Sequence, residues 1–410
     1  MGFRHLETCM SLANGRPYLA IPGPSVIPDR VLRAMHQGSP NIYEGPLIDL
    51  AASLWPDLRQ VAGTRHHLAA YIGNGHGGWE AANANLFSKG EKALVIAVGQ
   101  FGLSWANSAR AMGIEVEVLD FGKATPADMD QVEAALRADR DHRIKAVLAC
   151  HVDTASSIRT DIPALRAAMD AAGHPALLAV DCIASLGCDE YRMDDWGVDV
   201  TVAACQKGLM TPPGLAFVWF SDKARARCGR GDLASPYWAW GPRVDATEFW
   251  QIWDGTAPTA HLYGLRAALD MIAEEGLTNV WHRHRVLAGA VWAAFDSWSA
   301  GNPAIGLNVA KPADRASSVT AARFGAPHAT RLRQWCETKA GVTLGIGLGM
   351  AAETDPAYHG FLRVGHMGHV NAHMTLGALA VMEAGLMALD IPHGPGALAA
   401  AARVVAGGAL

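Results

Sequence analysis

Two ionisable residues near the middle of the chain stand in surroundings that favour chemistry. Lys207 follows the almost uncharged run 198–206 and precedes the uncharged run 208–217, so the sequence places no counter-charge beside its ammonium group. Desolvation lowers the pKa of a lysine in such a setting, and a neutral amine can attack carbonyl carbons. Asp181 ends the apolar run 177–180 in a similar way. Each residue also has an ordinary interpretation, as a solvated lysine at a strand end and as an aspartate that caps a helix.

The pairing of Lys207 with Asp181 is more specific than either residue alone. Both follow strand-like runs, so we expect them at the same edge of a parallel sheet, where ligands bind at the carboxyl ends of strands. A carboxylate opposite a lysine that forms a Schiff base is the arrangement that pyridoxal phosphate requires. The acid keeps the pyridine nitrogen protonated, and the ring then accepts electrons. The sequence therefore predicts a pyridoxal phosphate site at this edge.

Three further motifs could complete such a site. A glycine-rich turn around Asn74, Gly75 and His76 precedes a helical run, and the amide groups of such a turn can hold a phosphate. Phe101 lies between glycines after a strand-like run, where an aromatic ring can stack on a planar ligand. Arg363 lies in an apolar run, where a buried guanidinium needs an anion such as a substrate carboxylate. The ordinary interpretations are a capping histidine, a core aromatic residue and an internal ion pair.

The elements that must position these residues alternate between strands and helices over the first two thirds of the chain. This alternation indicates an α/β fold with a largely parallel sheet covered by helices on both faces. After about residue 260 the pattern changes to a long helical stretch, interrupted near Gly276, and then to a smaller α+β region. The expected strands are 66–73, 92–99, 114–121, 144–151, 175–182, 198–205, 215–221, 317–324, 341–347 and 361–368, and the expected helices are 78–88, 104–113, 128–139, 162–173, 259–298, 329–340 and 372–389.

Composition restricts the class of protein. The 410 residues carry a formal net charge of -5, and no basic run suggests a nucleic-acid surface. The 7 cysteines are scattered without a CxxC pair, so we expect neither a metal site nor a disulfide framework, and reduced thiols favour the cytoplasm. No run reaches the roughly 18 apolar residues that a membrane helix needs, and the first residues lack the apolar core of a signal peptide. We therefore expect a soluble cytoplasmic protein without a nucleic-acid or membrane partner.

Taken in order, these motifs resemble those of the class V aminotransferases of fold type I, and more narrowly the alanine–glyoxylate and serine–glyoxylate aminotransferases. The similarity extends over about residues 18–390. It implies a large domain with a mainly parallel seven-stranded sheet, a smaller C-terminal α+β domain, and a homodimer with shared active sites. We expect an N-terminal arm at 1–19, the large domain at 20–275 and the small domain at 276–410. The matching motifs are IPGPSVIPDRVLRAM, GNGHGGWEAANANLFSKGEKALVIAVGQFG, CHVDTASSIRTDI, VDCIASLG, QKGLMTPPGLA, GLRAALDMIAEEGLTNVWHRH and LRVGHMG.

The resemblance also implies a role for each candidate residue. Lys207 is similar to the Schiff-base lysine, and Asp181 to the partner of the pyridine nitrogen. Phe101 resembles the ring stacker, and Thr154 the neighbour of the cofactor's phenolic oxygen. Arg363 resembles the arginine that binds the substrate carboxylate. The other implied contacts are Asn74, Gly75, His76 and Gln206 at the phosphate, Thr256 at the phosphate of the partner subunit, and Gly23, Ser25 and Tyr43 at the substrate site.

Two positions depart from the family pattern. Trp253 stands where relatives have a tyrosine that reaches the partner's phosphate, and its indole N–H is the donor that it offers instead. Tyr43 stands where many serine–glyoxylate and aspartate–glyoxylate enzymes have the arginine of a His-Arg pair. Neither Tyr43 nor the adjacent Glu44 supplies a cation for a second carboxylate, so a monocarboxylate donor is expected.

These observations predict a pyridoxal phosphate-dependent aminotransferase that takes the amino group of alanine or serine and gives it to glyoxylate or pyruvate. The alternatives are a pyridoxamine–pyruvate aminotransferase, an aspartate–glyoxylate aminotransferase, a class V lyase or desulfurase, and a non-catalytic binding protein on the same scaffold. The phosphate turn at Asn74 argues against the first alternative. A lyase would want a reactive cysteine on a mobile loop, whereas Cys336 lies in a helical run.

Overall fold

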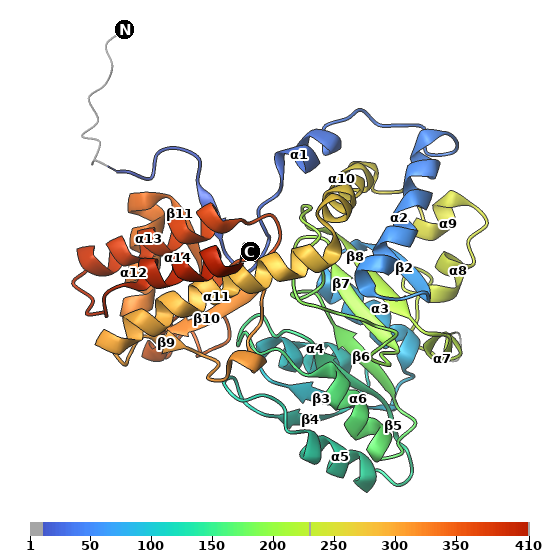
Figure 1. Cartoon of the computed structure of the whole chain (residues 1–410). Helices are drawn as coiled ribbons and strands as arrows, with labels where there is room; N and C mark the ends of the chain where they lie inside the picture. Colours follow the sequence, from blue (N-terminus) through green and yellow to red (C-terminus); the bar gives the residue numbers. More distant parts are fainter. Residues whose placement is uncertain (1–10, 229–230, 409–410) are drawn as a thin grey trace.

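The computed structural model describes residues 11–228 and 231–408, which form two regions built on separate β-sheets (Figure 1). The larger sheet has seven strands and the smaller has five. This arrangement confirms the expected α/β fold with a smaller α+β region. The division of the chain at 19/20 and 275/276 stays a prediction. Strand β1 (Tyr18–Ala20), at the first of these boundaries, pairs with β11 (Val342–Ile346) in the smaller sheet.

The larger sheet is mostly parallel, as the alternation of strands and helices predicted. Its order is β2-β8-β7-β6-β5-β3-β4, and β8 runs antiparallel to both β2 and β7 while the other pairs are parallel. Parallel pairing carries the carboxyl ends of β3, β4, β5, β6 and β7 to one edge. The strands are β2 (His67–Gly73), β3 (Lys92–Ala97), β4 (Glu115–Asp120), β5 (Ile144–Cys150), β6 (Leu177–Asp181), β7 (Val200–Ala204) and β8 (Gly214–Phe220).

Helices cover both faces of this sheet because alternate strand residues enter opposite cores. In β3, Leu94 and Ile96 belong to one buried cluster, and Ala93 and Val95 belong to the other. This is the period of two of an extended chain. The first cluster contains residues of α2 (Pro46–Ala62), α5 (Met129–Ala138), α6 (Ile162–Ala171) and α10 (Thr259–Glu275), and the second contains residues of α3 (Gly75–Leu86) and α4 (Gln100–Ala111).

The smaller sheet has the order β1-β11-β12-β10-β9 and packs its own core against four helices. One of these helices, α14, was not predicted, because its alanine-rich sequence looks like low complexity. Alanine nevertheless has the highest helix propensity, and Ala397 and Ala401 are buried in this core one turn apart. The other elements are β9 (Gly306–Leu307), β10 (Val319–Arg323), β12 (Phe361–Gly365), α11 (Leu277–Gly301), α12 (His328–Ala340), α13 (Ala372–Ala388) and α14 (Ala397–Gly408).

The predicted interruption of the long helix at Gly276 is confirmed. Gly276 has a φ of +83°, a backbone conformation that glycine adopts most readily, and it separates α10 from α11 (Figure 1). Each of the other predicted strands and helices has a counterpart in the structure. Along the described part of the chain, no helix combines the length and the apolar character that crossing a bilayer requires. The remaining short elements are α1 (Asp29–Met35), α7 (Asp222–Arg225), α8 (Trp240–Val244), α9 (Phe249–Trp253), η1 (Pro312–Asp314) and η2 (Pro356–Gly360).

Candidate active site

A cavity of about 240 Å³ lies where β5, β6 and β7 end and α3 begins. The parallel strands bring residues that are distant in the sequence to this one edge. The lining includes most residues that the sequence predicted for a cofactor: Asn74, Gly75, His76, Phe101, Thr154, Asp181, Gln206 and Lys207. It also includes Trp79, Val152, Ile183 and Ala184, which were not predicted.

Asp181 lies at the last position of β6 and both of its carboxylate oxygens are engaged. Oδ1 accepts a hydrogen bond of 2.6 Å from the main-chain N–H of Ile183, and Oδ2 accepts one of 3.0 Å from Nε1 of Trp79. The chain forms a turn after Asp181, so the ordinary interpretation as a helix cap was wrong. Burial raises the pKa of Asp181 to about 7, although both hydrogen bonds favour the charged form. A cation facing this carboxylate would stabilise its ionised form.

Lys207 has the lowered pKa that its sequence surroundings predicted. Burial lowers this pKa to about 8, the charge of Arg363 lowers it further, and the charge of Asp181 opposes the change. Nζ donates a hydrogen bond of 2.5 Å to the carbonyl oxygen of Pro22. A substantial fraction of this amine is therefore neutral near pH 8, which is the form that attacks carbonyl carbons.

The loop from Pro22 to Ser25 packs directly on Lys207. Gly23 has a φ of +100°, and a Cβ atom at this position would lie 2.2 Å from Nζ of Lys207, so only glycine fits here. Ser25 is buried, and its Oγ donates a hydrogen bond of 2.7 Å to the carbonyl oxygen of Lys207. Its main-chain N–H donates to the carbonyl oxygen of Gln206 at 2.9 Å. The structure thus places Gly23 and Ser25 against the lysine, while their contact with a substrate stays a prediction.

The N-terminus of α3 forms a second wall of the cavity. The side chain of Asn74 caps this helix by accepting hydrogen bonds from the main-chain N–H groups of His76 and Gly77, at 3.1 and 3.3 Å. Gly75 packs so closely on Ile183 that a Cβ atom would lie 2.2 Å from its Cδ1. Oε1 of Gln206 is buried without a hydrogen-bond partner among the described residues. The main-chain N–H groups and the dipole at a helix N-terminus are suited to an anion, whereas Oε1 of Gln206 calls for a hydrogen-bond donor.

Arg363 lies on β12 of the smaller sheet and reaches to the wall of the cavity. Its Nε donates to the carbonyl oxygen of Ile346 at 2.7 Å, and Nη1 donates to that of Thr154 at 2.9 Å. Burial lowers its pKa to about 10, and the charge of Asp153 opposes this shift. Within the described ranges no carboxylate lies within 4.0 Å of this guanidinium, so the interpretation as an internal ion pair was wrong. Its remaining N–H groups are available to an anion.

Asp153 is a site residue that the sequence analysis missed. It is fully buried, and Oδ2 accepts hydrogen bonds from the main-chain N–H groups of Phe101 and Gly102 at 2.7 and 3.1 Å. Trp79 was missed as well, although it follows the glycine-rich turn by one residue. Its ring stacks on Trp105 with centroids 5.8 Å apart and an interplanar angle of 8°. The sequence signal that could have identified Asp153 is an acidic residue directly before Thr154.

Five predicted site residues are not part of the lining of this cavity in the same chain: Gly23, Ser25, Tyr43, Thr256 and Arg363. Tyr43 is 85% exposed, and Thr256 is exposed in the turn after α9. Trp253 is buried in the core, where its ring lies 6.1 Å from that of Trp55, and it does not line the cavity either. An indole contact to a phosphate of the partner subunit would need this side chain to leave the core.

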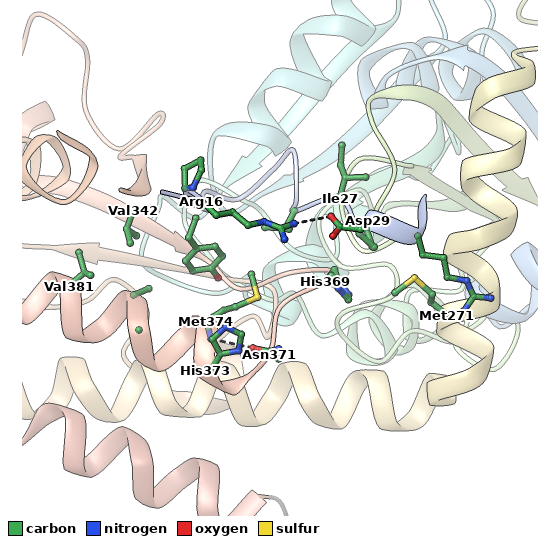
Figure 2. Close-up of a pocket in the computed structure, with 17 residues that line it drawn as sticks. Arg16, Ile27, Asp29, Met271, Val342, His369, Asn371, His373, Met374 and Val381 are labelled. Atoms are coloured by element: carbon green, nitrogen blue, oxygen red, sulfur yellow. Dashed lines mark hydrogen bonds and ion pairs between the residues drawn. The ribbon is translucent and has the colours of Figure 1, made fainter. Parts of the chain in front are cut away.

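A larger cleft of about 680 Å³ lies elsewhere, between the N-terminal segment, α10 and α13 (Figure 2). Its lining is largely apolar, and Arg16 there pairs with Asp29 at 2.9 Å. Figure 2 shows His369, Asn371 and His373 around the same cleft. None of the residues with the chemistry described above lines it. The smaller cavity is therefore the candidate active site despite its size.

Comparisons with known proteins agree with this geometry. The family model described as "Aminotransferase class-V" matches residues 18–376. The chain is 37% identical over 399 residues to a serine–glyoxylate aminotransferase of Methylorubrum extorquens, covering 95% of both chains. It is 35% identical over 393 residues to an L-aspartate–glyoxylate aminotransferase of Paracoccus denitrificans, covering 93% of this chain and 94% of the relative. The crystal structure of pyridoxamine–pyruvate aminotransferase from Mesorhizobium loti has the same fold, with a TM-score of 0.85, 24% identity, and coverage of 96% of this chain and 98% of that chain.

Proposed function

Because the chain belongs to the class-V aminotransferase family, we propose that it transfers the amino group of alanine or serine to glyoxylate or pyruvate with pyridoxal phosphate as cofactor. The observation that carries this proposal is the shared cavity of Lys207 and Asp181, with Arg363 hydrogen-bonded to its wall at Thr154. An amine of lowered pKa, a buried carboxylate and a guanidinium without a carboxylate partner are the groups that transamination of an amino acid requires. Among the described residues the cysteines are unpaired and mostly buried, and reduced thiols of this kind support a cytoplasmic location.

The residues of the cavity fit pyridoxal phosphate. Asp181 is buried with a raised pKa, so a protonated pyridine nitrogen facing it would relieve the cost of its burial. The N-terminus of α3 lines the same cavity and offers main-chain N–H groups to a phosphate. When bound, the cofactor supplies an electron sink that stabilises negative charge at the substrate's α-carbon.

The remaining cavity residues bind and orient the cofactor in this proposal. Asp181 holds a proton on the pyridine nitrogen, and Phe101 packs on the ring face. Thr154 lies beside the phenolic oxygen. The phosphate is bound by the N-terminus of α3 with Asn74, Gly75, His76 and Gln206, where the helix dipole favours negative charge.

Lys207 moves the proton. With the cofactor bound, its Nζ, with a pKa of about 8, would accept the α-proton of the substrate amino acid and would later release it to complete the transfer. A catalytic pKa near the working pH maximises both the population of the base and its driving force. The close packing of Gly23 and Ser25 on this lysine limits where Nζ can lie and excludes water from it.

Arg363 binds the substrate carboxylate. Two of its N–H groups are held by carbonyl oxygens of Ile346 and Thr154, which fixes the plane of the guanidinium. The other N–H groups can form the two parallel hydrogen bonds of an arginine–carboxylate pair. Amino donor and acceptor both present a carboxylate, so the same residue serves both half-reactions.

We propose small monocarboxylate donors because no second cation is supplied near Tyr43. Burying an unpaired carboxylate of a donor such as aspartate costs several kcal/mol. Tyr43 and Glu44 give the segment before α2 a polar but not a cationic character. The aspartate–glyoxylate relative makes aspartate the second candidate donor.

We also propose that the active protein is a homodimer in which Thr256 reaches the phosphate of the partner subunit. Thr256 lies outside the cavity of its own chain. Trp250 of α9, the helix just before Thr256, is 55% exposed, and Tyr43 and Ile72 elsewhere in the larger region are 85% and 43% exposed. Exposed apolar residues of this size support a protein interface.

A lyase or desulfurase of the same family is less well supported. Cys336 lies in α12 and is buried, and burial raises the pKa of its thiol to about 12. A thiol of this kind is inert at neutral pH, whereas those reactions need an exposed thiolate.

A screen of amino donors against acceptors tests the proposal. We expect alanine and serine with glyoxylate to give the highest kcat/KM, and Lys207→Ala to abolish turnover. A higher kcat/KM for aspartate would contradict the choice of donor. Use of pyridoxamine as the substrate would favour a pyridoxamine–pyruvate aminotransferase instead. Purified protein that is colourless and does not bind pyridoxal phosphate would contradict the function as a whole.

A further inference from the structure

Asp153 connects two parts of the candidate active site that come from different segments of the chain. Its Oδ2 accepts hydrogen bonds from the main-chain N–H groups of Phe101 and Gly102 at 2.7 and 3.1 Å. Its Oδ1 accepts one from Ala155 at 3.0 Å. One buried carboxylate thus holds both the first turn of α4 and the start of the loop after β5.

The first turn of α4 needs this contact because its own N-cap residue is Gly99. Glycine has no side chain that could accept hydrogen bonds from the free N–H groups at a helix start, so the N-cap residue itself provides no cap. A Cβ atom at Gly99 would lie 2.4 Å from Cγ of Asp153. Asp153 therefore replaces the missing cap from a distant part of the chain, and Gly99 leaves the room that it needs.

The same turn of α4 carries residues that face the site. Phe101 lines the cavity, and the residue before it, Gln100, packs against Gly349 of the smaller region, where a Cβ atom would lie 2.5 Å from Cβ of Gln100. A shift of this turn would therefore move the ring of Phe101. It would also change the contact between Gln100 and the loop after β11.

The hydrogen bond at Oδ1 of Asp153 is connected to Arg363 through the turn around Thr154. The bond to Ala155 N–H and the bond from Ser157 N–H to the carbonyl oxygen of Asp153, 2.8 Å long, shape a tight turn around Thr154. The carbonyl oxygen of Thr154 accepts the 2.9 Å hydrogen bond from Nη1 of Arg363. The place of this guanidinium thus depends on the turn that Asp153 stabilises.

We propose that Asp153 is a positioning residue that sets the ring of Phe101 and the guanidinium of Arg363 relative to each other. This inference rests on the proposed function, because it assigns the ring to a cofactor and the guanidinium to a substrate carboxylate. Asp153 itself acts through Phe101 and Thr154 and does not line the cavity.

Asp153→Ala tests this proposal, with Asp128→Ala as the matched control. Asp128 also accepts hydrogen bonds from two main-chain N–H groups, those of Asp130 and Gln131, but at the start of α5, away from the cavity. We expect Asp153→Ala to weaken the visible circular dichroism of bound pyridoxal phosphate and to raise the dissociation constants of cofactor and alanine by about ten-fold each, the loss expected of one hydrogen bond to a charged group. Asp128→Ala should leave all three unchanged.

Asp153→Asn separates the contacts of Asp153 with α4 from its contact with the turn around Thr154. The amide oxygen can still accept from Phe101 and Gly102, but the amide nitrogen cannot accept from Ala155. We expect cofactor affinity and circular dichroism close to those of the wild type, and an alanine dissociation constant raised by about five-fold. This variant keeps the proposal open to test if Asp153→Ala fails to fold, and an unchanged alanine dissociation constant would overturn the link to Arg363.

Amide hydrogen exchange of the cofactor-free protein separates this proposal from the proposed function. The amides of Phe101 and Gly102 should be protected in the wild type and should exchange faster in Asp153→Ala but not in Asp128→Ala. Unchanged protection in Asp153→Ala would overturn the link to α4 whatever the protein binds. Faster exchange with unchanged cofactor and alanine binding would show that Asp153 only caps α4, and this would overturn the positioning role. A wild-type protein that binds no pyridoxal phosphate would overturn the function and the positioning role with it, while the exchange data would still report the contact.

Discussion

Trp79 donates a hydrogen bond of 3.0 Å from Nε1 to Oδ2 of Asp181, and both side chains are buried. With the bond from Ile183 to Oδ1, both oxygens of this carboxylate are held in place. A group that has to face a cofactor ring in one orientation benefits from such restraint, because the cost of ordering it is met during folding. Trp79 is in turn held by its stacking on Trp105.

Trp79→Phe should weaken pyridoxal phosphate binding. The substitution keeps most of the aromatic packing but leaves Oδ2 of the buried Asp181 with only the weak thiol donor of Cys150 at 3.7 Å, and the loss of the indole donor costs about 1–3 kcal/mol. We expect an increase in the cofactor dissociation constant of about ten-fold, measured by titrating the cofactor-free protein. Trp298→Phe is the control, because the indole N–H of Trp298 is buried without a partner among the described residues. Equal effects of the two substitutions would show that the hydrogen bond does not matter.

Capture of pyridoxal phosphate by Lys207 should depend on pH. The neutral amine reacts, and its fraction grows as the pH rises through the pKa of about 8. The rate of capture by the cofactor-free protein should therefore rise from pH 6.5, reach half of its maximum near pH 8 and level off above about pH 9, whereas an exposed lysine, with a pKa near 10.4, would still gain steeply above pH 9. Stopped-flow absorbance measures this rate, and borohydride reduction followed by peptide mapping should find the label on Lys207. A label on another lysine would refute the assignment.

Arg363→Ala should raise KM for alanine and for glyoxylate together. The lost pair of charge-assisted hydrogen bonds is worth roughly 1.5–3 kcal/mol, or about 10- to 150-fold in KM. Arg59→Ala is the control, because Arg59 is partly buried and its Nε donates a hydrogen bond of 2.8 Å to the carbonyl oxygen of His66 without facing the cavity. It should reduce stability and leave both KM values unchanged. An effect of Arg363→Ala on only one substrate would contradict a common carboxylate site.

Gly23→Ala should block the reaction of Lys207 with pyridoxal phosphate. The new methyl group would overlap with Nζ, which a Cβ atom would approach to 2.2 Å. Gly15→Ala is the control, because Gly15 also has a positive φ, +140°, but no atom lies within 4 Å of a Cβ placed there. Both variants should lose some stability from backbone strain, and only Gly23→Ala should lose cofactor capture in the borohydride assay. Normal capture by Gly23→Ala would mean that the loop does not restrain the lysine.

Stability should fall in acid because three histidines, His151, His284 and His366, are buried with lowered pKa values. His284 donates from Nδ1 to the carbonyl oxygen of Val280 at 2.7 Å and accepts at Nε2 from the main-chain N–H of Gly368 at 2.9 Å. Burial lowers the pKa of His284 to about 3 and that of His366 to about 4. The folded-state values lie below the unfolded value near 6.5, so the unfolded state binds more protons in acid.

The stabilising contribution of these histidines is therefore complete above about pH 6.5 and is lost as the pH falls towards 4, by on the order of 3 kcal/mol for each. Urea unfolding of the cofactor-free protein at pH 7.5 and pH 5 measures the change in the free energy of unfolding. His284→Gln should show a smaller change than the wild type, and His36→Gln, at an exposed position, should show the same change. An equal pH dependence in His284→Gln would contradict the burial of a neutral imidazole.

The sequence by itself determined the alternation of strands and helices. It also identified Lys207 and Asp181, two ionisable residues that follow strands, as candidates for catalysis. Lys207 and Asp181 could be predicted together because parallel strands must bring their carboxyl ends to one edge, a consequence of topology that needs no side-chain coordinates. The glycine-rich turn and Phe101 follow from the same rule. The break at Gly276 was readable because glycine tolerates a positive φ.

The tertiary structure alone decided which side chains restrain those residues. Trp79 reaches Asp181 across 102 positions of sequence, and Asp153 reaches Phe101 across 52, and no periodic pattern encodes such contacts. Whether Arg363 forms an ion pair also depended on its neighbours in space, which are carbonyl oxygens and not carboxylates. Helix α14 escaped prediction because its alanine- and glycine-rich run looks like low complexity, and its burial depends on α11 as a partner. Local propensity and alternation are properties of a segment, whereas hydrogen-bond partners are properties of the packed chain.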